Sequence, residues 1–173
     1  YPDSDVPIVE PENIGDADTL GEKEQRTLEI VRAAIQNGER ALIYTSWVRT
    51  DSQQKLKKLL TDEGYRTEIL TDKIKTTDRE DWVQKKLAAG MQVLIANPSL
   101  VETGLDLNAF TTLVFYSMGY KLFTLRQASR RSWRINQKAP AVKVYMLYYE
   151  DTMQQKCLKL MASKLAVAGL IEG

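Results

Sequence analysis

Two hydrophobic patterns alternate along most of this sequence, and together they predict a regular succession of strands and helices. Short runs of mostly apolar residues are typical of buried strands, and such runs cover Arg40–Tyr44, Met91–Ala96, Thr112–Tyr116 and Val142–Tyr148. Thr67–Leu70 is predicted to be a further strand. Elsewhere, apolar residues recur every three or four positions, which is the period of an amphipathic helix. This period predicts helices over Lys23–Asn37, Ser52–Glu63, Thr77–Ala89, Leu122–Arg134 and Thr152–Ala168.

The segments that join these elements carry their own signals. Gly38, Gly64 and Gly90 follow three of the helical patterns, and we expect them to end those helices. The pattern Thr77-x-x-Glu80 is that of a capping box, which predicts a helix that opens at Thr77. Asn97–Leu107 contains Gly104 and is predicted to be a long loop.

Strands that alternate with helices of about a dozen residues indicate βαβ units. Such units form a parallel sheet with helices on both faces, so the predicted fold class is α/β. Ligands of these folds bind beyond the carboxyl ends of the strands. The loops after the strands are therefore the first places to look for functional residues.

Length and composition indicate one domain and an additional arm. The chain has 173 residues, of which 43% are hydrophobic, and this is enough for one globular core. Residues 1–20 hold three of the five prolines and six acids without a base, so we expect an acidic linker or arm there, followed by a domain over residues 21–173. The sequence begins at Tyr1 and shows no signal peptide or membrane span. We therefore expect a piece of a longer intracellular protein, cytoplasmic or, in a eukaryote, nuclear.

The inventory of reactive side chains excludes several kinds of enzyme. There is no histidine, which excludes Ser-His-Asp and Cys-His nucleophilic sites. The lone Cys157 lies in a helical apolar pattern and is expected to be a buried thiol. With these two features a zinc site is not expected, and no metal ligands are assigned.

The net charge of +1 conceals an uneven distribution. With the six acids of the arm removed from the total of 23, residues 21–173 hold 24 basic and 17 acidic side chains. No acid lies between Asp106 and Glu150, whereas that interval holds seven lysines and arginines. Such a local excess indicates a polyanionic partner, either a nucleotide or a nucleic acid.

The most basic stretch is Gln127–Gln137, which reads QASRRSWRINQ. On the predicted helix, Gln127, Arg131 and Arg134 share one side. A guanidinium is planar and always charged, so two of them one turn apart suit a phosphoryl group that is being transferred. A solvated helix face is the common alternative for arginines at this spacing.

The order of these motifs resembles the C-terminal RecA-like lobe of superfamily 2 DEAD/DEAH-like helicases, nearest to the Swi/Snf-type translocases. The likeness runs from about Arg40 to Tyr148. Its most specific part is the family pattern Gln-Ala-x-Asp-Arg-x-His-Arg-Ile-Gly-Gln, which is matched at Gln127, Ala128, Arg131, Arg134, Ile135 and Gln137. Departures occur at Arg130, Trp133 and Asn136, where the family has Asp, His and Gly.

The resemblance implies a three-layer αβα sandwich around a mainly parallel sheet, and it implies roles for single residues. Arg134 is expected to be the arginine finger with Arg131 as its catalytic partner. ATP is expected to contact Gln127, Gly104 and Asp106. Nucleic acid is expected to contact Ser46, Ser99, Glu102 and Tyr120. Pro98 lies near the usual place of a threonine, so Ser99 is taken as its substitute.

Half of an ATPase site is missing from the sequence. No G-x-x-x-x-G-K-[ST] phosphate loop occurs, and no Asp-Glu pair follows an apolar strand. ATP and Mg²⁺ are therefore expected to bind only together with a preceding RecA-like lobe of the same protein, and this chain alone is expected to be inactive and monomeric. Double-stranded DNA is the favoured nucleic acid, because the Gln-Ala pattern is similar to that of translocases.

Two other functions are compatible with the sequence. A helicase-like lobe can serve as a non-catalytic module that binds nucleic acid or protein, because the same arginines suit phosphate backbones. A doubly wound enzyme that acts on phosphorylated small molecules, such as a nucleotide-sugar transferase, is the less favoured alternative.

Overall fold

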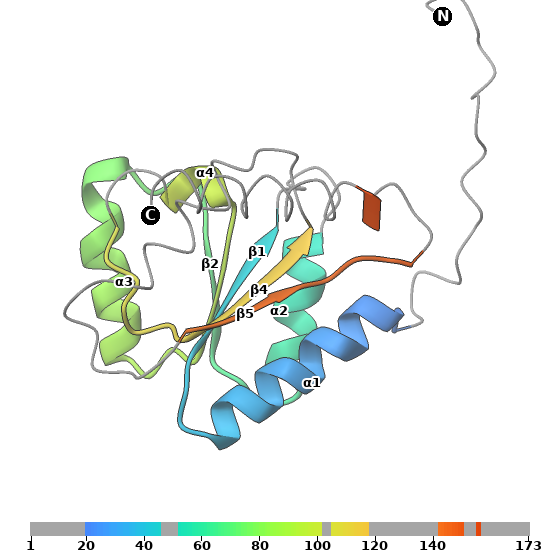
Figure 1. Ribbon diagram of the computed structural model, residues 1–173. Coiled ribbons are helices and arrows are strands. Elements are labelled where there is room, and N and C mark those ends of the chain that lie inside the picture. The colour runs from blue at the N-terminus through green and yellow to red at the C-terminus, as the bar shows by residue number, and fades with distance from the viewer. Residues whose placement is uncertain (1–19, 46–51, 102–104, 118–141, 151–154, 157–173) are drawn as a thin grey trace, which may run out of the picture.

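The computed structural model describes residues 20–45, 52–101, 105–117, 142–150 and 155–156, and these form a twisted sheet with helices packed on it (Figure 1). The strands are all parallel and lie in the order β2-β3-β1-β4-β5. Their bounds are β1 Ala41–Thr45, β2 Thr67–Leu70, β3 Val93–Ala96, β4 Thr112–Ser117 and β5 Lys143–Met146. Within the described residues, β2 and β5 are the two edge strands.

Helices cover both faces of the sheet. Their bounds are α1 Glu22–Gln36, α2 Ser52–Asp62, α3 Arg79–Ala88 and α4 Pro98–Val101, with a short 3-10 helix η1 at Thr76–Asp78. α1 and α2 bury leucines and Val31 against one face, together with Ile43 of β1 and Ile69 of β2. α3 and α4 bury Val83 and Val101 against the other face. The result is an αβα sandwich, as the alternating pattern predicted.

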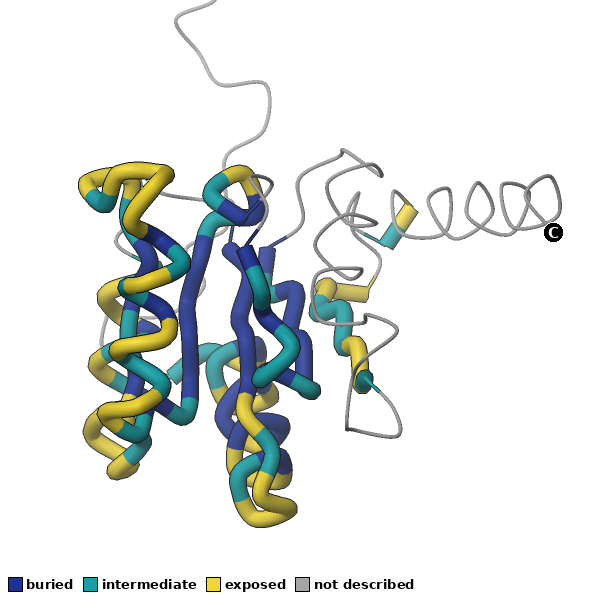
Figure 2. The backbone as a smooth tube through the Cα atoms, turned by 90° about the vertical axis from the view of Figure 1, so that its left-hand side faces the viewer, coloured by how far each residue is buried: buried dark blue, intermediate teal, exposed yellow. Residues whose placement is uncertain are grey.

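The burial of β1 on both faces of the sheet accounts for its continuous apolar sequence. All five of its residues are buried, and its side chains alternate between the two helix layers. β1 pairs with β3 on one side and with β4 on the other, and the ring of Tyr44 stacks on that of Phe115 with centroids 4.9 Å apart. A strand buried on both faces has no polar positions to interrupt its pattern. Figure 2 shows this buried centre between exposed helix surfaces.

The predicted strands are confirmed, and no strand end is shifted by more than two residues; β5 is shorter than the predicted Val142–Tyr148. The three helices expected between residues 23 and 89 are confirmed as α1, α2 and α3. Gly38, Gly64 and Gly90 follow them with φ of 74°, 88° and 90°, a conformation that glycine adopts without strain. The helices predicted over Leu122–Arg134 and Thr152–Ala168 lie outside the described residues, apart from helical residues 155–156.

Two local predictions were wrong. The expected loop Asn97–Leu107 begins with α4, because Asn97 accepts the N–H of Ser99 at 3.0 Å and Pro98 occupies the first helical position. The capping box at Thr77 does not form either. α3 begins at Arg79, and the Thr77 hydroxyl donates to the carboxylate of Asp78 at 2.8 Å. Glu80 is bonded to a distant loop instead, as described below.

Candidate functional site

The carboxyl ends of the parallel strands share one edge of the sheet, and a cavity of about 220 Å³ opens there. It lies where β2 and β3 end, and one residue of the first turn of α2 also lines it. Its lining residues are Gln53, Leu70, Thr71, Asp72, Asn97, Ser99 and Leu100. The mixture of hydroxyl, amide and carboxylate groups over an apolar floor suits a polar ligand.

Ser99 is the one predicted nucleic-acid contact that lies within the described residues, and it lines this cavity. It is exposed, and its hydroxyl donates to Asn97 Oδ1 at 2.9 Å. That bond orients the Ser99 oxygen and leaves its lone pairs available as acceptors. Asn97 thus fixes both the backbone and the side chain of Ser99. Asn97 was not assigned a role from the sequence, although it directly follows a buried strand.

Asp106, the predicted ribose contact, lies in a turn held between two buried leucines. Leu105 and Leu107 point into the core, and Asp106 between them is half-buried. Asp106 Oδ1 accepts the N–H of Asn108 at 3.1 Å, which closes a local turn. The N–H of Asp106 donates to Glu80 Oε2 at 2.8 Å. The aspartate is therefore held in place from both its backbone and its side chain.

The remaining predicted site residues lie outside the described residues. They are Ser46, Glu102, Gly104, Tyr120, Gln127, Arg131 and Arg134. The last described residues before Ser46 and Tyr120 are Thr45, at the end of β1, and Ser117, at the end of β4. The Ser117 hydroxyl donates to Thr45 Oγ1 at 3.0 Å, so these two strand ends lie side by side.

A second polar group, which was not predicted from the sequence, lies beside the ends of β4 and β5. Lys23 at the start of α1 is buried, and burial lowers its pKa. Its ammonium donates to the Tyr116 carbonyl at 3.4 Å and lies 4.6 Å from the centre of the Tyr149 ring. These contacts fasten the first turn of α1 to the strand ends.

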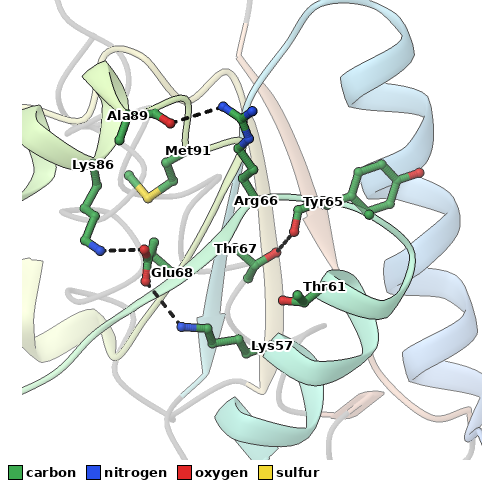
Figure 3. A pocket seen from close by; sticks show the side chains of 10 residues that line it. Lys57, Thr61, Tyr65, Arg66, Thr67, Glu68, Lys86, Ala89 and Met91 are labelled. Carbon is green, nitrogen blue, oxygen red and sulfur yellow. Dashed lines mark hydrogen bonds and ion pairs between the residues drawn. The ribbon is translucent and has the colours of Figure 1, made fainter.

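A larger cavity, of about 370 Å³, lies at the amino end of β2, away from the predicted site residues (Figure 3). Glu68 joins Lys57 of α2 and Lys86 of α3 at 3.3 and 2.6 Å. Burial opposes ionisation of Glu68, but the bonds from the two lysines outweigh it and hold its pKa below the usual value. Because α2 and α3 cover opposite faces, this bridge closes around the edge strand and has a structural role.

Within the described segments, no three metal-ligating side chains lie close enough together to hold a metal ion. Nor does any described helix combine the length and the apolar character that crossing a bilayer requires.

The family described as the helicase conserved C-terminal domain matches residues 22–136 of this chain. An uncharacterized ATP-dependent helicase of Mycoplasma pneumoniae is 24% identical over 143 residues, which are 82% of this chain and 14% of that protein. The chain thus spans a small part of the relative's length.

Two solved structures share the fold. The C-terminal part of the Fun30 ATPase domain has a TM-score of 0.71 at 18% identity, over 80% of this chain and 44% of that one. The Pyrococcus furiosus Hef helicase domain has a TM-score of 0.61 at 17% identity, over 80% of this chain and 27% of that one. These likenesses confirm the predicted RecA-like arrangement of a parallel sheet between two helix layers.

Proposed function

Because this chain belongs to the family of helicase conserved C-terminal domains, as its motifs predicted, we propose that it is the second motor lobe of a nucleic-acid-dependent ATPase. Residues 21–173 form the lobe in this proposal, and residues 1–20 join it to a preceding lobe. One observation carries the proposal. The cavity that contains Ser99 and the turn that contains Asp106 both belong to the segment that follows the parallel strand β3. Ligands of these folds bind beyond the carboxyl ends of such strands.

The nucleotide half of the proposed function needs two lobes. The preceding lobe holds the phosphates and Mg²⁺, whose charge offsets that of the γ-phosphoryl group. This chain contributes Arg134 as the finger and Arg131 as its catalytic partner, while Gln127, Gly104 and Asp106 contact the nucleotide. The turn that fixes Asp106 supports this role, because a carboxylate already held by the N–H of Asn108 loses little conformational freedom when a ligand binds.

The nucleic-acid half of the proposed function uses the cavity and the basic stretch. Ser99 contacts a phosphate at the cavity, and Ser46, Glu102 and Tyr120 are assigned further contacts with the nucleic acid. The acid-free interval between Asp106 and Glu150 supplies the positive charge. We favour duplex DNA and translocation of the Swi/Snf type, a placement supported by the TM-score of 0.71 to the Fun30 fragment.

Titration of a labelled DNA duplex with this chain at several salt concentrations tests the nucleic-acid half. Contacts from lysine, arginine and backbone N–H to phosphates predict weak binding that depends strongly on salt and little on base sequence. Ser99→Ala is expected to weaken binding by roughly twofold to fivefold, the effect of one phosphate hydrogen bond. Thr61→Ala, which removes a hydroxyl from the cavity of Figure 3, is the matched control and should leave the affinity unchanged. Binding that does not respond to salt contradicts the proposal.

A further inference from the structure

Two adjacent residues at the start of α3 bond to loops on the ligand-binding edge of the sheet. Arg79 is 7% exposed, and its guanidinium donates to two carbonyls, that of Ile74 at 3.2 Å and that of Leu100 at 3.0 Å. Glu80 accepts the N–H of Asp106 at 2.8 Å. These side chains therefore join the loop after β2, the end of α4 and the turn of Asp106 to one helix terminus.

The positions of these contacts connect the two halves of the proposed site. Leu100 lines the cavity beside Ser99, and Ile74 belongs to the loop that carries the lining residues Thr71 and Asp72. Asp106 lies on the other side of residues 102–104. One helix turn thus holds the described backbone on both sides of residues 102–104.

α3 is a suitable anchor because it is itself fixed to the core. Val83, one turn after Arg79, is fully buried among the side chains of the sheet. Burial of a guanidinium costs free energy unless its N–H groups find acceptors, and the two carbonyls supply them. A hydrogen bond from a backbone N–H to a carboxylate is also stronger than one between neutral groups. The loops are therefore held by charge-assisted bonds to a rigid element.

We propose that Arg79 and Glu80 are positioning residues that hold the nucleic-acid cavity and the Asp106 turn as one unit. This inference rests on the proposed function, in which those two places contact nucleic acid and ATP. Neither residue needs to touch a ligand. Their role is to keep Ser99 and Asp106 at a fixed separation, so that a phosphate bound at the cavity finds the loop already in its binding position.

Amide hydrogen exchange of this chain tests the anchor directly. Glu80→Ala removes the acceptor, so the N–H of Asp106 should exchange about tenfold faster or more, as expected for loss of one bond to a charged group. Glu80→Gln keeps a side-chain oxygen that can accept the N–H of Asp106, so most of the protection of this N–H from exchange should be restored. Asp81→Ala is the matched control, since it removes an exposed carboxylate from the neighbouring position of α3. It should leave Asp106 unchanged.

The same variants are then compared for binding of the labelled DNA duplex. A positioning role predicts affinity about fivefold to tenfold weaker for Glu80→Ala, substantial recovery in Glu80→Gln and wild-type affinity for Asp81→Ala, at equal melting temperature. Exchange of Asp106 within twofold of wild type in Glu80→Ala overturns the proposal, and so does a loss of affinity that Gln does not recover. If the wild-type chain does not bind the duplex, the nucleic-acid part of the proposed function is wrong. The exchange rate of the Asp106 N–H in Glu80→Ala still decides whether Glu80 holds the Asp106 turn.

Discussion

The Tyr116 hydroxyl donates a 2.7 Å hydrogen bond to the carboxylate of Glu24, which lies 92 residues earlier in the chain. Burial and the Glu24 charge both raise the pKa of Tyr116, so the phenol stays protonated and remains a donor. Glu24 is also 3.9 Å from the ammonium of Lys55 on α2. Tyr116 therefore joins the last part of β4 to the start of α1, and through Glu24 to α2.

Removal of this one hydroxyl is expected to destabilise the fold without loss of packing. Tyr116→Phe keeps the ring but leaves the Glu24 carboxylate without its neutral donor, so the free energy of unfolding should fall by about 1–2 kcal/mol. Tyr148→Phe deletes a hydroxyl from an exposed residue and should change stability by less than about 0.5 kcal/mol. Urea denaturation of both variants measures the difference. Equal stabilities would show that the Tyr116–Glu24 bond contributes nothing.

The edge strand β5 is fastened by a bond that depends on pH. Glu39 accepts from Lys143 at 2.6 Å and from Thr112 at 2.7 Å, and these bonds, that of Lys143 first, lower its pKa. A carboxyl whose pKa is lower in the folded state stabilises the fold above its unfolded pKa, about 4.3 for glutamate. That stabilisation is lost as the pH falls through the lower, folded value.

Glu39→Gln is therefore expected to be less stable than wild type at pH 7, with a difference that shrinks below about pH 5 and disappears in stronger acid. Lys143→Gln removes the main partner and should reduce the same acid dependence. Unfolding measured by urea at several pH values from 7 to 3 checks this. A difference that stays constant or widens in acid would contradict the assigned role of Glu39.

The isolated chain is expected to show no ATP hydrolysis. It lacks the phosphate loop whose lysine and hydroxyl hold the phosphates and Mg²⁺. Hydrolysis is measured with Mg²⁺ and with duplex DNA, for wild type and for Arg134→Ala. Turnover that survives repeated purification and is lost in Arg134→Ala would mean that a complete site exists within this chain.

The strand order along the chain and the α/β class could be predicted because both depend on local patterns. β1 and β3 are buried along their whole length and β4 along most of it, so their sequences are mainly apolar runs that differ from the helical period. The glycines after α1, α2 and α3 marked the helix ends, since each adopts a positive φ.

The contacts of α3 could not be predicted, because they depend on distant segments. Thr77 and Glu80 have the spacing of a capping box, but the Glu80 carboxylate is bonded to the N–H of Asp106, 26 residues later. Nothing local distinguishes these two uses of one glutamate. Arg79 was assigned no role from the sequence, although it is buried and its guanidinium donates to the carbonyls of Ile74 and Leu100. The Asn97 cap was also missed, because a four-residue helix is too short to show a period.

In the proposed function this lobe supplies the arginine finger of the ATPase, and one variant of the two-lobe protein tests that role. If Arg134 reaches the γ-phosphoryl group only when the lobes close, it stabilises the transition state more than bound ATP. Arg134→Ala should then lower the kcat of DNA-stimulated hydrolysis by roughly a thousandfold or more, with a smaller change in KM for ATP. Arg134→Lys should fail to restore it, because a point charge does not reproduce the planar fork. The assignment is contradicted if Arg134→Ala hydrolyses ATP at more than about a tenth of the wild-type rate with an unchanged melting temperature. Arg134 would then be a solvent-exposed residue of a helix surface.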